Sequence, residues 1–223
     1  MRLSNRTDLP GAARSAGLRL GAQLISLIFH PLFITSYLTA FLLYIHPLAF
    51  AGWDPPQKFF RLITVFLSTA FLPLLAVLLS WRLGLAVKSL QLRTAKERIV
   101  PYVISLTLYW WPYHVFSNLP GIPLIATILL LGSFLAVCGG FFCNIFFRIS
   151  MHAIAMGALM MFFLLYSFHD SYASGVYLSS AVGLAGLVCT ARFLVSDHSP
   201  ADVYGGLLVG ALAQGIGWLV LAP

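Results

Sequence analysis

Long apolar runs divide the chain, and short polar stretches separate them. Each run is close to the ~20 apolar residues that a helix needs to cross the hydrocarbon core of a bilayer. The pattern therefore predicts an all-α fold, an integral membrane helical bundle of six to seven transmembrane helices. The predicted spans cover residues 21–46, 59–81, 101–118, 123–146, 151–168, 175–195 and 203–221.

Composition supports a single membrane domain. Of the 223 residues, 60% are hydrophobic and only 9% are charged, whereas soluble proteins average about 25% charged residues. We predict a basic N-terminal tail over residues 1–20 and one transmembrane helical domain over residues 21–223. The first apolar run is too long for a cleaved signal peptide, so we expect it to be retained. We interpret three histidines in or near the spans as packing or interfacial residues. They are His30, which directly precedes Pro31, and His46 and His114.

The net charge of +7 does not indicate a nucleic-acid-binding protein. The cations cluster in loops between apolar runs, where Lys and Arg govern membrane topology. Cys138, Cys143 and Cys189 lie in apolar stretches without metal-binding spacing, so they are expected to be small buried hydrophobic residues. The sequence shows no carboxylate cluster for Mg²⁺ and no Cys/His set for zinc. We therefore expect no metal and no cofactor.

Three polar loops are predicted on the same face of the membrane. The loop at 82–101 follows two crossings, the loop at 147–152 follows four and the loop at 191–202 follows six. An even number of crossings returns the chain to the face on which it started. These loops can therefore build one site.

The last of these loops holds the strongest candidate chemistry. Pro200 suits the first turn of a helix, which places Asp202 about one turn beyond His198. A carboxylate there fixes the imidazole tautomer and leaves the other ring nitrogen available as a base or nucleophile. Arg192 adds a fork of donors suited to phosphate. The alternative is a loop that is polar only because it faces water.

The middle loop offers a helix start with a histidine. Ser150 is a good N-cap, and the amides at the start of the following helix would form an anion-binding position. His152 in the first turn is placed to donate a proton to a leaving oxygen. The alternative is an ordinary serine cap beside an interfacial histidine.

The first loop is cationic. Four cations stand against a single acid, Glu97, and they suit a phosphate group. Such cations are equally expected from the positive-inside rule or from binding to anionic lipid headgroups, so both interpretations stay open. The cations are Lys88, Arg93, Lys96 and Arg98.

These residues resemble the type-2 phosphatidic-acid phosphatase superfamily, whose site is shared by vanadium haloperoxidases. Its third signature, Ser-Arg-x5-His-x3-Asp, is matched in full spacing by Arg192, His198 and Asp202, with Ala191 where the family often has Ser. The resemblance covers about 110 residues, and the order of the motifs agrees with that of the family.

The other two signatures match in part. Ser150 and His152 keep the spacing of Pro-Ser-Gly-His, but Ile149 and Met151 replace Pro and Gly, and the change to Met would narrow the phosphate site. The first signature, Lys-x6-Arg-Pro, departs most. Its residue types occur at Lys96, Arg98 and Pro101 with different spacing, and Arg93 is a rival for the arginine.

The resemblance implies a membrane-embedded, metal-independent lipid phosphate or diphosphate phosphatase. His198, oriented by Asp202, would form a phosphohistidine, and His152 would protonate the leaving group and then activate water. Arg192, Lys96, Arg98, Ser150 and Arg93 are the candidates to hold phosphoryl oxygens. The substrate would be a lipid in the bilayer, of the polyprenyl diphosphate, phosphatidylglycerol phosphate, phosphatidate or lipid A phosphate class.

The sequence gives conflicting indications about the membrane face of the site. Arginines in the N-terminal tail and cations in the site loops outnumber those in the opposite loops, so the positive-inside rule favours the cytoplasmic side. Many bacterial members of the resembled family, which lie in the inner membrane, have their site on the outer side. We expect the protein to lie in a bacterial inner (cytoplasmic) membrane, and the charge count favours the cytoplasmic side for the site while the outer side remains an alternative.

Three other functions remain as alternatives. One is a non-catalytic lipid- or partner-binding protein of the same fold, favoured by the departures at Met151 and in the first loop. Another is a phosphotransferase that hands the phosphoryl group to an alcohol. A small transporter would place ionisable residues deep within spans, whereas here they collect at one face.

We also expect the helices after the first loop to form the core of the site and the first span to pack at the periphery.

Overall fold

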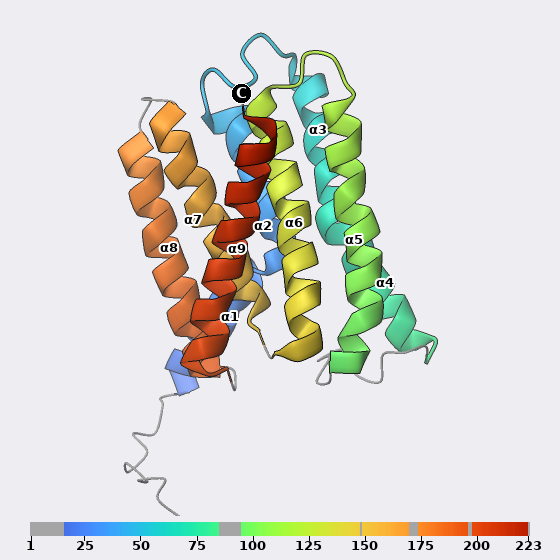
Figure 1. Ribbon diagram of the computed structural model, residues 1–223, viewed down its shortest axis with the longest axis vertical. Coiled ribbons are helices and arrows are strands. Elements are labelled where there is room, and N and C mark those ends of the chain that lie inside the picture. The colour runs from blue at the N-terminus through green and yellow to red at the C-terminus, as the bar shows by residue number, and fades with distance from the viewer. Residues whose placement is uncertain (1–15, 85–94, 148, 170–173, 196–197, 223) are drawn as a thin grey trace, which may run out of the picture.

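The computed structural model describes residues 16–84, 95–147, 149–169, 174–195 and 198–222, and at residues 16, 95–98 and 174 it describes the backbone alone. Within these ranges the chain is helical, without a β-strand (Figure 1). The helices are α1 (Ala16–Ile28), α2 (Pro31–Ala40), α3 (Pro55–Phe66), α4 (Leu72–Arg82), α5 (Ala95–Ser117), α6 (Leu124–Phe146), α7 (Met151–His169), α8 (Ser174–Val195) and α9 (Pro200–Leu221). Two π-helical segments, η1 (Phe41–Ile45) and η2 (Leu67–Phe71), continue α2 and join α3 to α4.

The predicted all-α membrane bundle is confirmed. Within the described ranges, five helices are long and apolar enough to cross a bilayer, and one of them runs unbroken over Pro55–Arg82. A sixth candidate is a broken span, Gly17–Ile28 with Pro31–Ile45, which bends by 58°. The helix α5 is 23 residues long but lies outside this set. Its tyrosines, tryptophans and prolines lower its mean hydropathy.

Prolines and caps set the helix boundaries. Proline occupies an early position in α2, α3 and α9, where its missing N–H costs no hydrogen bond. A turn follows α5, and Gly121 adopts a positive φ of 78° in it. A side chain would strain the backbone at that φ, so glycine suits the position.

A π-helical segment accommodates the proline within the second span. Pro73 cannot donate a backbone hydrogen bond, and an ordinary α-helix would leave the carbonyl one turn before it without a donor. At η2 the chain widens by one residue, so that the N–H of Leu72 donates to the carbonyl of Leu67. The helix therefore passes the proline without breaking.

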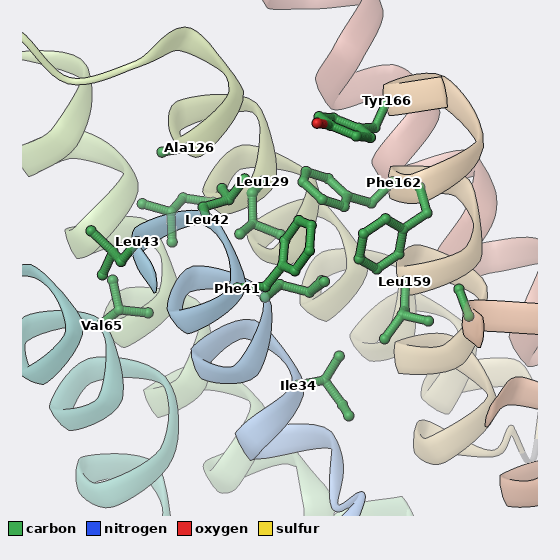
Figure 2. Close-up of a cluster of buried hydrophobic side chains, with 14 of the residues drawn as sticks. Ile34, Phe41, Leu42, Leu43, Val65, Ala126, Leu129, Leu159, Phe162 and Tyr166 are labelled. Atoms are coloured by element: carbon green, nitrogen blue, oxygen red, sulfur yellow. The ribbon is translucent and has the colours of Figure 1, made fainter. Parts of the chain in front are cut away.

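The main hydrophobic core brings the first span into the centre of the bundle. Figure 2 shows Ile34 and Phe41, from the first span, beside Leu129, Leu159 and Phe162 from α6 and α7. The helix α2 packs against α3, α6 and α7. The expectation that the first span packs at the periphery was therefore wrong. The apolar residues of α2 are needed to fill the space between α3, α6 and α7.

Glycines allow α7 and α9 to approach closely. A Cβ atom on Gly210 would lie 1.8 Å from the carbonyl oxygen of Ile154, and one on Gly157 would lie 2.0 Å from that of Leu207. Gly206 stands one turn before Gly210 and faces the start of α7 in the same way. Small residues spaced four apart are a common way to pack membrane helices backbone to backbone. This contact fixes the start of α7 against the start of α9.

The outer surface of the bundle is strongly apolar. Leu219 is 81% exposed, Phe168 is 75% exposed and Phe146 is 74% exposed, with many similar residues on the other helices. Soluble monomers rarely leave large apolar patches open to water. The protein is therefore an integral membrane protein whose outer face contacts lipid.

The helix ends that flank the three predicted site loops gather at one end of the bundle. The end of α4 and the start of α5, the end of α6 and the start of α7, and the end of α8 and the start of α9 all lie at the lower end of Figure 1. The described helix ends agree with the prediction that these loops share a face, and residues 85–94, 148 and 196–197 of the loops lie outside the described residues.

Candidate active site

The start of α9 positions His198 and Asp202. Ser199 is the N-cap, and its hydroxyl accepts the N–H of Asp202 at 3.2 Å. In return, Oδ2 of Asp202 accepts the N–H of Ser199 at 2.8 Å, which completes a capping box. The same Oδ2 lies 3.5 Å from Nδ1 of His198. The carboxylate therefore favours a proton on Nδ1 and leaves Nε2 as the nitrogen with an available lone pair.

The start of α7 is tied to the start of α9. Ser150 is fully buried, and its hydroxyl accepts the N–H of Ala153 at 3.5 Å, as an N-cap does. Its own N–H donates to the carbonyl oxygen of Asp202 at 3.1 Å. The hydroxyl predicted to bind phosphate thus caps α7 inside the protein. In the first turn of a helix the backbone N–H groups have no carbonyl partner within the helix. The amides of Met151 and His152 are therefore the hydrogen-bond donors at the start of α7.

His152 is held by the first span. Its Nε2 donates to the carbonyl oxygen of Ser26 in α1 at 3.0 Å. Because a carbonyl can only accept, this bond places a proton on Nε2. Nδ1 is therefore the nitrogen of His152 that can exchange a proton with a substrate.

Arg192 supplies a positive charge close to His30 and His152. It lies in the last turn of α8 and is half-buried. Its charge acts on both His30 and His152, and His198 also interacts electrostatically with His152. Four predicted residues, Arg192, His152, His198 and Asp202, therefore gather at one end of the bundle.

His30 belongs to the same cluster, and the sequence analysis had assigned it to packing. The ring of His30 lies 5.4 Å from the ring of His152, centroid to centroid, in an edge-on arrangement. Its Nδ1 accepts the N–H of Leu32 at 3.4 Å and caps α2, which places the proton of the neutral ring on Nε2. The signal available in the sequence was the His30-Pro31 pair, a polar ring directly before a helix-breaking proline within an apolar run.

The other two histidines assigned to packing lie apart from this cluster. His46 is buried, contacts the hydroxyl of Tyr166 and accepts the N–H groups of Leu48 and Ala49. His114 stacks on Trp110 near the end of α5. Both are at the opposite end of the helices from His152.

The cationic cluster of the first loop cannot be placed at the site. Lys88 and Arg93 lie outside the described residues, as does Arg148, and only the backbone of Lys96 and Arg98 is described, in the first turn of α5. The same helix nevertheless reaches α7, because the hydroxyl of Tyr102 contacts the sulfur of Met151. The side chain of Met151 thus packs toward α5.

An apolar cavity of about 310 Å³ opens beside the histidines. His30 and His152 line one end of it, and Leu38, Leu129 and Leu159 line the interior. Ligand sites in proteins typically begin near this volume and are mostly apolar with a few polar groups. A hydrocarbon chain in this cavity would have its head at His30 and His152.

Within the described ranges, no three His, Cys, Asp or Glu side chains are arranged to hold a metal ion. Arg192, the imidazole rings and the helix starts are the groups of this cluster that could bind an anion. Comparison with protein-family models, curated proteins and solved structures finds no match to this chain.

Proposed function

We propose that the protein is a membrane-embedded lipid phosphate or diphosphate phosphatase that acts through a phosphohistidine. The observation that carries the proposal is the convergence of Arg192 and His198 on His152, with Asp202 beside His198. A fixed cation, an oriented nucleophile and a second histidine are what phosphoryl transfer requires for positioning and charge neutralisation. Membership in the type-2 phosphatidic-acid phosphatase superfamily is part of the same proposal.

The first step transfers the phosphoryl group to the enzyme. Nε2 of His198 attacks phosphorus, a nitrogen–phosphorus bond forms and the bond from phosphorus to the leaving oxygen breaks. Protonated His152 gives its Nδ1 proton to that oxygen. Asp202 stabilises the positive charge that His198 acquires, and Arg192 neutralises the phosphoryl oxygens.

The second step releases phosphate. Neutral His152 takes a proton from water as the water oxygen attacks phosphorus, and the nitrogen–phosphorus bond breaks. His198 returns to its neutral form, and inorganic phosphate leaves. Each histidine ends the cycle in its starting protonation state. An alcohol in place of water would make the same chemistry a phosphotransfer.

The lipid character of the substrate rests on the cavity. It is apolar, it lies within a bundle whose outer face contacts lipid, and it ends at His30 and His152. A substrate with a hydrocarbon chain in the cavity would present its phosphate to His152 and its neighbours Arg192 and His198. Lys96, Arg98 and Arg93 remain candidates for further contacts with that phosphate.

Phosphate release from a panel of lipid phosphates and diphosphates tests the proposal. The full chain in detergent is assayed with EDTA present, alongside a His198→Ala variant. Release that survives EDTA and disappears in the variant is expected. No release from folded wild-type protein would favour a non-catalytic lipid-binding protein, and release abolished by EDTA would overturn the metal-independent mechanism.

A further inference from the structure

One side of α7 runs along the cavity from the candidate active site into the bundle. His152, Ala155 and Leu159 follow one another at helical spacing, and all three line the cavity. At 1.5 Å per residue, Leu159 lies about 10 Å beyond His152 along the helix axis. The cavity thus has a polar end at His152 and a deep end at Leu159.

The main hydrophobic core closes the deep end of the cavity. Leu38 and Leu129 line the cavity together with Leu159, and each of these three leucines is 5% exposed or less. Phe162, about one turn beyond Leu159, is fully buried in the same core (Figure 2). A chain that enters from the histidine end therefore meets packed side chains after about 10 Å.

The hydroxyl groups along the cavity are paired with one another. Thr35 donates to Ser133 at 3.1 Å, and the hydroxyl of Tyr109 hydrogen-bonds to Thr35. Most of the other lining side chains are apolar. A polar substituent on a bound chain would lose its hydrogen bonds to water without replacing them, whereas methylene groups have none to lose. The lining therefore favours an unsubstituted hydrocarbon chain.

The size of the cavity limits the length of that chain. An extended carbon chain with bonds of about 1.5 Å advances by about 1.3 Å per atom, so about 10 Å holds about eight carbons. The volume sets a similar limit. A protein cavity of about 150 Å³ holds the six carbons of benzene, and this cavity, at about 310 Å³, has room for roughly twice as many. One chain of about eight to twelve carbons fills it, and a second chain beside the first has no room.

We propose that the protein is selective for a lipid phosphate with a single unsubstituted chain of about eight to twelve carbons, and that Leu159 sets this length. Ala155, about one turn closer to His152, leaves open the space through which the chain passes. The inference rests on the proposed phosphatase function, because a phosphate bound at His152 defines the end from which the chain is measured. A longer chain must fold back or hold its phosphate away from His198.

The test compares straight-chain alkyl monophosphates of increasing length. Each is present at the same mole fraction of the detergent, so that partition into the micelle is the same for all. For the wild-type protein, kcat/KM should be highest at about eight to twelve carbons. For a chain of about eighteen carbons it should be about tenfold lower, which corresponds to about 1.4 kcal/mol, because the additional methylene groups have no room in a packed interior.

Two substitutions on α7 should move this optimum in opposite directions. Leu159→Ala removes three carbons from the deep end, so the best chain should become longer by about two to three carbons. Ala155→Leu adds three carbons nearer to His152, so the best chain should become shorter by at least as much. Because Ala155→Leu fills a cavity instead of enlarging one, it tests the inference even if Leu159→Ala does not fold.

Leu42→Ala is the matched control. Leu42 is fully buried in the same core as Leu159, and it is not among the residues that line the cavity. This variant also loses a buried leucine side chain, yet it should keep the optimum of the wild type. A wild-type protein without an optimum, or an optimum that neither Leu159→Ala nor Ala155→Leu moves, overturns the inference.

A binding measurement separates this inference from the phosphatase proposal. Alkyl phosphonates of the same lengths have a carbon–phosphorus bond in place of the ester, so they bind without being hydrolysed. The shift in Tm that each one causes is measured at a fixed mole fraction. A largest shift at the expected length, moved by the α7 substitutions, supports the inference even if no phosphate is released from any substrate. Phosphate release with neither a rate optimum nor a Tm optimum rejects the length limit and leaves the phosphatase standing.

Discussion

The backbone N–H of Ser150 donates to the carbonyl oxygen of Asp202 at 3.1 Å. This bond joins the N-cap of α7 to the first turn of α9, close to the two histidines of the candidate site. His152 follows Ser150 by two residues, and His198 precedes Asp202 by four. The two helix starts are thus held together by a backbone hydrogen bond, which fixes the relative position of the backbone segments that carry the two imidazoles.

Replacing Asp202 with Asn tests the orientation of His198. Asn retains an oxygen that can accept the N–H of Ser199, so the start of α9 should hold. The charge that stabilises protonated His198 is lost, and kcat for phosphate release should fall by about 10²-fold or more.

Asp54→Asn is the matched control for this change. Asp54 is the N-cap of α3, which begins at the opposite end of the bundle. This variant should keep wild-type kcat in the same assay. Equal losses in the two variants would show that the effect of Asp202 is general rather than exerted through His198.

A change of His152 to Gln tests proton transfer to the leaving group. The amide of Gln retains a donor for the carbonyl oxygen of Ser26 but cannot transfer a proton. We expect kcat on an alkyl phosphate to fall by about 10²–10⁴-fold. On an aryl phosphate, whose leaving oxygen needs less protonation, the loss should be smaller.

His114→Gln serves as the comparison, because His114 stacks on Trp110 away from the site. It should leave both rates unchanged. If His152→Gln slows both substrates equally, His152 acts in positioning or in the hydrolysis of the phosphohistidine and not as the acid.

His30 provides a test of a residue that the sequence analysis had assigned to packing. In His30→Asn the new side chain can still accept the N–H of Leu32 and cap α2. The imidazole beside His152 and Arg192 is lost, so kcat/KM should fall about tenfold, which corresponds to about 1.4 kcal/mol, at nearly unchanged Tm. His30→Ala should lose the cap as well and lower Tm. If His30→Asn keeps the wild-type kcat/KM, the imidazole of His30 contributes only to structure.

Gly210→Ala tests the close packing of α7 and α9. The added methyl group would meet the carbonyl oxygen of Ile154 at 1.8 Å, so the helices must separate. Overpacking of this kind costs about 1–3 kcal/mol, and thermal unfolding in detergent should show a lower Tm.

Gly205→Ala is the control on the same helix. No atom lies within 4 Å of a Cβ at Gly205, and alanine favours the helix by up to about 1 kcal/mol. Its Tm should equal or exceed that of the wild type. A similar fall in both variants would mean that glycine itself, and not the contact with Ile154, matters on α9.

Helix positions followed directly from the sequence. Predicted spans such as 123–146 and 175–195 agree with α6 and α8 to within a residue at each end. The spacing of His198 and Asp202 also predicted their approach, because residues four apart near a helix start lie on one face. These features depend on local chemistry, which a sequence displays.

The contribution of the first span was misjudged because it depends on packing between distant segments. Nothing in the apolar run around His30 distinguishes a central span from a peripheral one. The 58° bend before Pro31 brings Ser26 and His30 to His152, and the apolar residues that follow enter the main core. That arrangement depends on which helices pack against one another, and the local sequence does not show this.

By itself, the sequence determined an apolar helical bundle, the ends of its helices and the sharing of one face by the helix ends that flank its polar loops, because hydropathy and helix-breaking residues act locally. Only the tertiary structure decided that His30 joins the site and that the hydroxyl of Ser150 caps a buried helix start. The physical reason is that each of these depends on the close approach of helices far apart in the chain. Glycines such as Gly132 and Gly210 permit that approach, and its consequences appear only when the helices are packed together.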